Sequence, residues 1–581
     1  MKAATIRSLL DVMKGKTEPD AIIINGKIIN VFTNSIDEGS AIVVKDGLIA
    51  SIEDDDKASG YGPSTIIDAE GLYLCPGFID AHTHIDSLYP FYAFAPYAIR
   101  GGTTTVVTET SAVACAAGME GVASFTESTQ DYPVRCYFLA PPLTPPFPEM
   151  EGSKGLTLSE FKKFLKRDDV VAIGEAYWTR IVEGDPRILK QAEAALELNK
   201  KLDGHAAGAH GKRLIEYALT GITSCHESIT VDEVLEKLRF GIYIMIRQGF
   251  VRKELPELKG LKDMDIDTRR LILTSDVFDA VMLKEEGYLD SIVRAAISYG
   301  FRPIDAIKMA TINPADYYGL RHLGAIAPLR HADILFLKDI ENVSIERVMA
   351  GGKMVFAAGQ YLENIKPHHY PHAARNTVKA QKITPDDLKV AFRPNSGLVR
   401  VIKILNQTIT QEITWKPPVR NGYLEKDLSS DIIPVSVINR YNSSIKGKGF
   451  ITGTGIKEGA FATTLIWDTG NILTMGSSEE DMVMAVNRLI DLQGGTVIVK
   501  DGRIIFEFPM PVYGTMPVGT IDEIADKTQE MVRSVRQIGV TLERPFLTLQ
   551  TIPFSGLPFL RITDKGLADI KNRRLVPLFI D

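Results

Sequence analysis

The sequence predicts an α/β protein built on a (β/α)8 barrel, with a small β-domain and a C-terminal α+β domain attached to it. Short apolar stretches alternate with amphipathic stretches from residue 76 to residue 320, which is typical of repeated strand–helix units. Polar residues follow several of the apolar stretches, as expected where the carboxyl ends of barrel strands carry an active site. The chain of 581 residues has room for about three to four domains.

Residues 1–75 are predicted to form the N-terminal part of the small β-domain. Short strands alternate there with turns, and the dipeptides Asn25-Gly26 and Asp46-Gly47 are both typical of hairpin turns. Residues 321–362 return to β character after the barrel. We therefore expect a composite β-domain, to which both flanks of the barrel contribute strands.

The barrel, residues 76–320, is expected to begin with an apolar strand that ends in a His-x-His motif, followed by seven strands with helices between them. The later strands are predicted at Thr104–Thr108, Arg135–Leu139, Val170–Ile173, Leu202–Gly204, Ile222–Ser224, Tyr243–Arg247 and Leu271–Ser275. Helices are predicted at Leu158–Leu165, Ile188–Leu202, Leu214–Leu219, Val231–Leu238 and Tyr288–Tyr299.

Two regions follow the composite domain. Residues 363–396 are polar and contain His368, His369 and His372 among prolines. No other ligand type accompanies these histidines, so a solvated linker is favoured over a metal-binding tract. Residues 397–581 contain two long amphipathic helical stretches and an Asp-Gly hairpin, and they are predicted to form the α+β domain.

The composition is that of an ordinary globular protein, with 45% hydrophobic and 24% charged residues. The net charge of −7 gives no basic field for nucleic acid, and no apolar stretch is long enough for a membrane span of about 18 residues. The four cysteines lack metal-site spacing and are expected to be free thiols. We expect a cytoplasmic homo-oligomer that acts on a small molecule, without nucleic-acid or membrane partners.

The first barrel strand carries the sequence PGFIDAHTHID at residues 76–86. Residues two apart on a strand lie on the same face, so His82 and His84 point the same way. Two adjacent imidazoles suit a divalent transition metal, and Asp80 is placed to orient one of them from behind. The alternative to a metal site is a pair of surface histidines at the end of a strand, and the residues further along the chain disfavour it.

Six side chains that can bind metal follow predicted barrel strands: His82, His84, Glu175, His205, His226 and Asp276. This set predicts a two-metal site in which Glu175 bridges two divalent cations and Asp276 binds the first cation and holds a proton. Two cations about 3.5–4 Å apart share a hydroxide and lower its pKa toward neutrality. Each residue alone also fits an ordinary polar group at a strand end, but all six together do not.

The chain resembles the amidohydrolase superfamily in "PGFIDAHTHID", in Gly174-Glu175, in "DGHAAG", in "CHES" and in "TSD". The C-terminal stretches "DMVMAVNRLIDLQGG", "PFLTLQTIPFSGLPFLRITDKGLADI" and "RLVPLFI" are similar to the bacterial adenine deaminase family, so the resemblance covers nearly the whole chain. It implies a metal-dependent hydrolase barrel with two Mn, Fe or Zn ions. It also implies hydrolysis of adenine to hypoxanthine and ammonia by a metal-bound hydroxide, with Asp276 and Glu175 as catalytic residues.

The sequence departs from this family at the residues expected to read the substrate. Where the family typically carries Asp-Pro-His-Glu, this chain has Glu109-Thr110-Ser111-Ala112. The C-terminal motif Ala-His-Asp-Ser-His-Asn is replaced by residues 466–471, which read Ile-Trp-Asp-Thr-Gly-Asn, and the family's Asp-Asp pair is Ser275-Asp276. Glu109, Asp86 and Ser111 are candidate substrate-binding residues.

Two other functions stay open at this point. The same hydroxide would serve a hydrolase that opens the ring of a different purine or a cyclic amide, and product analysis separates that reaction from deamination. A non-catalytic metal-binding scaffold is the third candidate, although none of the six ligands is lost. The altered pocket motif predicts weak activity on adenine, or a preference for a larger or more oxidised purine.

Overall fold

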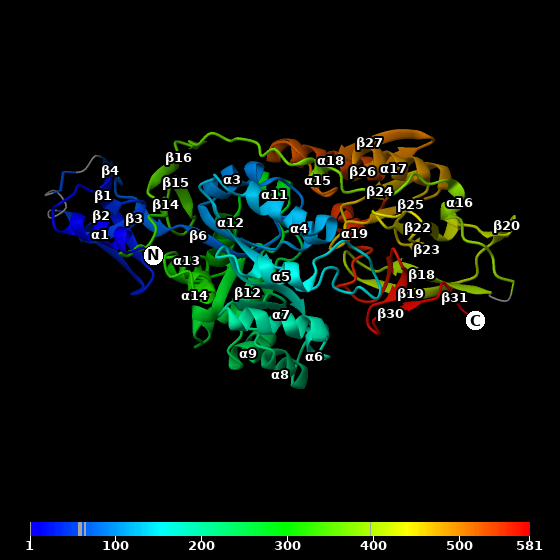
Figure 1. Cartoon of the computed structure of the whole chain (residues 1–581), viewed down its shortest axis with the longest axis horizontal. Helices are drawn as coiled ribbons and strands as arrows, with labels where there is room; N and C mark the ends of the chain where they lie inside the picture. Colours follow the sequence, from blue (N-terminus) through cyan, green and yellow to red (C-terminus); the bar gives the residue numbers. More distant parts are fainter. Residues whose placement is uncertain (1, 56–60, 63–64, 395–396, 581) are drawn as a thin grey trace.

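The computed structural model describes residues 2–55, 61–62, 65–394 and 397–580. The small β-domain, the barrel and the C-terminal domain lie one after another along the long axis of the molecule, from left to right in Figure 1. The predicted α/β architecture, a (β/α)8 barrel with a composite β-domain and a C-terminal α+β domain, is present. No helix in the described ranges has the length and apolar character needed to cross a membrane.

The small β-domain is a nine-stranded sheet to which both flanks of the barrel contribute. Strands before the barrel are β1 (Ala21–Asn30), β2 (Ser35–Lys45), β3 (Leu48–Asp54), β4 (Ile66–Asp68) and β5 (Tyr73–Pro76). Strands after it are β14 (Ile334–Asp339), β15 (Ser344–Ala350), β16 (Lys353–Ala357) and β17 (Gln360–Tyr361). Because β5 pairs with β1 on one side and with β14 on the other, the composite domain predicted from the sequence is confirmed.

One predicted hairpin in this sheet is wrong. Asp46-Gly47 does form the turn between β2 and β3, but Asn25-Gly26 lies inside the continuous strand β1. Asn25 adopts a left-handed conformation with φ of 56°, and the pairing with β2 shifts register at Gly26. The dipeptide therefore forms a bulge, because Asn tolerates positive φ in a bulge as readily as in a hairpin turn.

The barrel contains eight parallel strands in two hydrogen-bonded groups. They are β6 (Phe78–Thr83), β7 (Thr103–Thr108), β8 (Arg135–Ala140), β9 (Val170–Tyr177), β10 (Lys201–His205), β11 (Ser224–Cys225), β12 (Tyr243–Arg247) and β13 (Leu271–Thr274). The groups join where Thr223 N donates to Leu202 O, and where Asp276 N donates to His82 O at 3.0 Å. The second contact brings the first strand beside the last one and closes the barrel.

Helices surround these strands (Figure 1). They are α3 (Phe91–Arg100), α4 (Ser111–Ser128), α5 (Leu158–Leu165), α6 (Trp178–Val182), α7 (Pro186–Glu197), α8 (Lys212–Leu219), α9 (Val231–Arg239), α10 (Leu255–Leu258), α11 (Ala280–Glu285), α12 (Leu289–Ser298), α13 (Pro303–Met309) and α14 (Ile312–Tyr318). Every residue of β6 is buried. The Pro-Gly lead-in to β6 has a steric reason, because a Cβ on Gly77 would lie 2.3 Å from Thr104 Oγ1.

The C-terminal domain is a nine-stranded sheet covered by two long helices. Its strands are β18 (Leu398–Ile404), β19 (Thr410–Trp415), β22 (Ile433–Ile438), β23 (Lys446–Thr452), β24 (Ala460–Thr463), β25 (Ile472–Gly476), β26 (Gly495–Lys500), β27 (Arg503–Pro509) and β31 (Phe579–Ile580). The helices α17 (Glu479–Leu492) and α18 (Ile521–Gln537) coincide with the two predicted amphipathic stretches. The shorter α19 (Pro545–Thr551) follows them.

The described part of the polar segment, residues 363–394, packs against both larger parts of the protein. Tyr370 and Ala374 are buried against the barrel helices, whereas Val378 and Leu388 are buried against the C-terminal sheet. The short helices α15 (His372–Arg375) and α16 (Pro385–Leu388) lie within it. Its histidines belong to neither group of potential metal ligands found among the described residues.

The barrel and the C-terminal domain contact each other through helices and through one long loop. Lys284 of α11 lies 2.7 Å from Asp526 of α18. The loop between β8 and α5 reaches the C-terminal domain, where Gly152 N donates to Asp564 Oδ1 at 2.9 Å. Asn471 Nδ2 in turn donates to Gly152 O at 2.9 Å. These contacts fix the C-terminal loops above the carboxyl ends of the barrel strands.

Candidate active site

The six predicted metal-binding residues lie together at the carboxyl ends of the barrel strands. His82 is in β6 and His84 directly follows it, Glu175 is near the end of β9, and His205 ends β10. His226 follows β11 and Asp276 follows β13. The parallel strands bring these residues to one end of the barrel, although up to 194 positions separate them in sequence.

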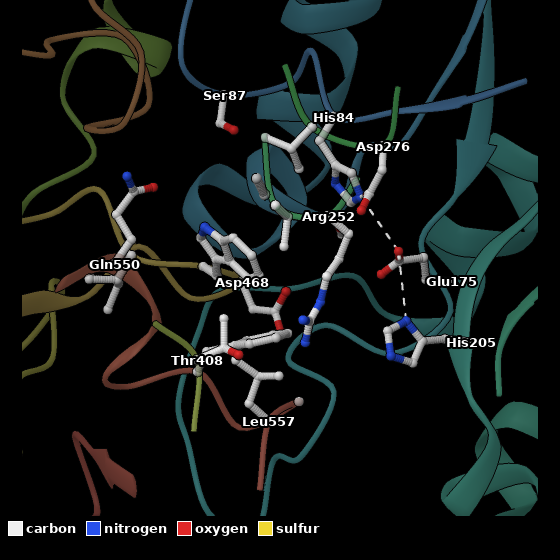
Figure 2. Close-up of a pocket in the computed structure, with 18 of the residues that line it drawn as sticks. His84, Ser87, Glu175, His205, Arg252, Asp276, Thr408, Asp468, Gln550 and Leu557 are labelled. Carbon is white, nitrogen blue, oxygen red and sulfur yellow. Dashed lines mark ion pairs between the residues drawn. The ribbon is translucent and has the colours of Figure 1, made fainter. Parts of the chain in front are cut away.

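Glu175 lies at the centre of this group. Its Oε1 atom is 3.2 Å from His82 Nε2, 3.5 Å from His84 Nε2 and 2.9 Å from His226 Nε2. His205 Nδ1 is 3.9 Å away from the same oxygen. Burial disfavours ionisation of Glu175, but His226, His205 and His82 hold the pKa of its carboxyl well below the usual value. A single carboxylate thus faces all four imidazoles, two of which are drawn with it in Figure 2.

The donor set suits divalent metal ions. His82, His84, Glu175 and Asp276 form one group of potential ligands, and Glu175, His205 and His226 form a second, with ligand atoms within 4.8 Å of one another. His205 Nδ1 is buried and has no hydrogen-bond partner in the described ranges. Buried imidazole nitrogens that lack a partner are costly unless a ligand satisfies them. The two groups share only Glu175.

Arg247, at the end of β12, connects Asp276 to two glutamates that the sequence analysis did not single out. Its Nη1 contacts Glu227 Oε1 and lies 3.2 Å from Asp276 Oδ2, and its Nη2 donates to Glu254 Oε1 at 2.6 Å. Burial disfavours ionisation of Glu227, yet Arg247 and the neighbouring histidines lower its pKa to about 2. Arg247 is the last residue of a strand whose bounds the sequence predicted correctly. The rule that polar residues at the carboxyl ends of barrel strands belong to the active site would therefore have found it.

Asp80 does not orient a metal-binding imidazole, contrary to the expectation from the sequence. Its Oδ1 accepts from Thr274 Oγ1 at 2.6 Å, and its Oδ2 accepts from Tyr288 OH at 2.6 Å. Asp80 lies in the fully buried strand β6, and its carboxylate faces Thr274 of β13 and Tyr288 before α12 instead of the metal-binding imidazoles. It therefore holds the closure between the first and last strands.

Two of the three candidate substrate-binding residues lie behind the site. Glu109 Oε1 accepts from Glu175 N at 2.7 Å, and a Cβ on Gly174 would lie 2.3 Å from both Glu109 oxygens, which explains the glycine before Glu175. Burial raises the pKa of Glu109 to about 8. Asp86 Oδ2 accepts from Ala112 N at 2.8 Å, and burial raises the pKa of Asp86 to about 6.

A cavity of about 270 Å³ lies above the histidines, and its walls come from both the barrel and the C-terminal domain. From the barrel side, His84, Glu175, His205 and Asp276 line it together with Ser111. Neither Asp86 nor Glu109 lines the cavity, because the carboxylate of each residue is turned toward backbone N–H groups. Of the three candidates for substrate contact, only Ser111 faces the cavity.

The far wall comes from loops of the C-terminal domain, and it includes residues of the altered family motif at 466–471. Thr408, Trp467, Asp468, Gln550 and Leu557 line the cavity there. Figure 2 shows Asp468, Gln550 and Thr408 across the cavity from Glu175 and His205. The rule of barrel strand ends does not place these residues at the site, because only tertiary packing brings them to the end of the barrel.

Comparisons with known proteins agree with this geometry. Residues 73–355 match the Amidohydrolase family, and residues 407–574 match the Adenine deaminase C-terminal domain. The barrel and its histidine–carboxylate group thus define a metal-dependent hydrolase that acts on C–N bonds.

Full-length relatives identify the family more closely than the two domain matches do. "Adenine deaminase" of Moorella thermoacetica is 34% identical over 99% of this chain and 98% of its own length. "Adenine deaminase 1" of Carboxydothermus hydrogenoformans is 33% identical over 98% of both chains, and "Adenine deaminase" of Kosmotoga olearia is 33% identical over 99% of both. The chain belongs to the adenine deaminase family.

Proposed function

We propose that this protein deaminates adenine by hydrolysis, so that adenine and water give hypoxanthine and ammonia. The observation that carries the proposal is the convergence of four histidines, Glu175 and Asp276 beneath a cavity whose other wall is an adenine deaminase C-terminal domain. Full-length relatives that carry the name adenine deaminase support it. No observation favours ring opening of a cyclic amide or a purely structural metal site.

In this proposal, His82, His84 and Asp276 would hold a first divalent cation, His205 and His226 would hold a second, and Glu175 would be a ligand shared by both. The donor set of imidazoles and carboxylates suits Mn, Fe or Zn. Two such ions supply, when bound, a water molecule of lowered pKa. The buried Nδ1 atom of His205, which has no hydrogen-bond partner among the described residues, supports the second position in particular.

Asp276 accepts a proton from the attacking water and passes it to the leaving amino nitrogen. Its geometry supports this role, because Arg247 donates to Oδ2 at 3.2 Å, while Oδ1 lies 3.5 Å from His84 Nε2. The guanidinium thereby fixes which carboxylate oxygen faces the ligands. The apolar wall formed by Leu465, Ile466 and Phe554 suits the flat faces of a purine.

The protein is further proposed to act in the cytoplasm. All four cysteines are unpaired, which fits a reducing compartment. The homo-oligomer expected from the sequence stays a prediction that sedimentation of the purified protein would test.

Product analysis tests the function directly. Protein loaded separately with Mn, Fe or Zn is incubated with adenine, and hypoxanthine and ammonia are measured. We expect the two products in equal amounts, and their loss in Asp276→Asn. A ring-opened product without ammonia would contradict deamination and support the cyclic-amide alternative.

A further inference from the structure

Asp468 differs from the other carboxylates that line the cavity. Glu175 and Asp276 belong to the metal-binding groups, and Glu227 contacts Arg247. Asp468 has neither kind of contact in the described part of the chain, and its Oδ2 atom is buried without a hydrogen-bond partner there. Figure 2 shows Asp468 on the other side of the cavity from Glu175, with the side chain of Arg252 drawn between them. A buried carboxylate oxygen without a partner needs a ligand to satisfy it.

The backbone holds this carboxylate in place at some conformational cost. Asp468 has a φ of 62°, and Thr469 N donates to Trp467 O at 2.9 Å around it, which makes Asp468 the centre of a three-residue turn. The fully buried Arg440 anchors the turn from behind, since Nη1 donates to Gly470 O at 3.1 Å. Left-handed backbone at a non-glycine residue persists where surrounding contacts determine it, often at functional sites.

The surroundings of Asp468 suit a flat, nitrogen-containing ring. The rings of Trp467 and Phe554 pack edge to face, with centroids 5.1 Å apart, and both residues line the cavity beside Asp468. On the barrel side, the first turn of α4 presents only Ser111 and Ala112, neither of which can ionise near pH 7. Among the described residues that line the cavity, Asp468 is therefore the carboxylate that is free to meet a ring nitrogen.

The charge state of Asp468 fits proton exchange near neutral pH. Burial raises the pKa of Asp468 to about 7, and the negative charge of Glu175 adds to this shift, while His84 and His205 oppose it. A group that titrates near the working pH can both give and take a proton.

We propose that Asp468 of the C-terminal domain contacts the substrate and donates a proton to a ring nitrogen as water adds to the amino-bearing carbon. This inference rests on the proposed adenine deamination. The O–H bond of Asp468 breaks and an N–H bond forms at the ring nitrogen, while water forms a C–O bond to the carbon and the ring C=N double bond becomes a single bond. The bond from this carbon to the amino nitrogen then breaks as ammonia leaves and the C=O bond forms. Water gives up two protons over the cycle: one leaves with ammonia through Asp276, and the other restores Asp468.

Asp468→Asn and Asp468→Ala test the proposal in the full-length, metal-loaded protein. Asparagine keeps the size and can still form a hydrogen bond, but it cannot supply a proton. We expect kcat for adenine to fall about 100-fold in Asp468→Asn with KM changed less than about threefold, whereas Asp468→Ala also raises KM. Metal content, measured by elemental analysis, should stay at the wild-type level in both variants.

Asp501→Asn is the matched control. Asp501 is also left-handed, with a φ of 52°, but it lies in the exposed turn between β26 and β27. Its replacement should leave kcat unchanged. A wild-type enzyme that deaminates adenine, with Asp468→Asn within threefold of it, would overturn the role of Asp468 and leave the proposed function intact. If the wild-type protein neither binds nor converts adenine, both the role of Asp468 and the proposed function are overturned.

Discussion

At the residue scale, Glu175 is the single link between the two groups of potential metal ligands. Glu175→Gln removes the negative charge that faces all four histidines, so both cations should lose affinity together. We expect elemental analysis to find two equivalents of divalent metal in the wild type and a joint loss at both positions in the variant. Loss of only one equivalent would contradict a bridging role.

Ser111 and Ala112 give a second prediction at this scale. Both are half-buried and line the cavity at the first turn of α4, where the helix N-terminus favours a negative charge. Replacing them together by His and Glu should raise adenine turnover, because the pair restores an acid and a base beside the ring. Turnover of adenine, with product identified, is the measurement.

The residues present at positions 111 and 112 also predict how the wild-type protein acts on adenine. We expect weak adenine turnover in the wild type, or faster turnover of a larger or more oxidised purine. A wild-type kcat for adenine on the order of 10 s⁻¹ or more would contradict the interpretation of positions 111 and 112 as altering specificity.

Residues differ in how well a sequence alone can place them. His82, His84 and Asp276 are found because a barrel brings every strand end to one place, so position along a strand predicts position in space. No such rule predicts the place of Asp468, since it lies on a loop of another domain that packs over the cavity. Asp80 was misjudged because alternation fixes the face on which a side chain lies, but not the partner it meets there.

At the element scale, α18 connects the C-terminal sheet to the barrel, and its first turn has a complete capping box. Thr520 Oγ1 accepts from Glu523 N at 3.2 Å, and Glu523 Oε2 accepts from Thr520 N at 2.8 Å. Thr520→Ala should lower the free energy of unfolding by about 1 kcal/mol. Urea denaturation measures this change.

Thr17→Ala serves as the control for the cap, because Thr17 is exposed and lies outside any helix. Its effect should be within about 0.5 kcal/mol of zero. Equal stability of Thr520→Ala and Thr17→Ala would show that the cap is dispensable.

The elements themselves were largely predictable from periodicity and turn residues. The bounds predicted for α5 and β12 coincide with the structure, because their apolar spacing is regular and polar or turn residues flank both. Asn25-Gly26 was misread since the same dipeptide suits a bulge and a hairpin turn, and only the pairing partner decides between them.

At the scale of the whole molecule, the interface between the barrel and the C-terminal domain contains a buried acid. Glu151 accepts from Phe147 N at 3.1 Å in the long loop after β8. Burial raises its pKa to about 8, and the negative charges of Asp468 and Asp564 contribute. In an unfolded chain a glutamate titrates near about 4.3.

Glu151 therefore binds a proton in the folded protein but not in the unfolded chain between these two values. The free energy of unfolding should fall as the pH rises through this window, and the loss should be complete above the folded pKa. Glu151→Gln keeps the acceptor for Phe147 N but cannot ionise, so it should flatten this part of the stability curve. Urea denaturation across the window, with wild type and variant side by side, makes the comparison, and parallel curves would contradict it.

The composite sheet also has a consequence for how the chain is made. Strand β5 emerges from the ribosome before the barrel, whereas its partner β14 emerges only after the whole barrel has been translated. During that interval one edge of β5 has no native partner, and an open strand edge can pair with another chain. The nascent chain is therefore prone to aggregation until β14 has been translated and Ile334 pairs with Pro76.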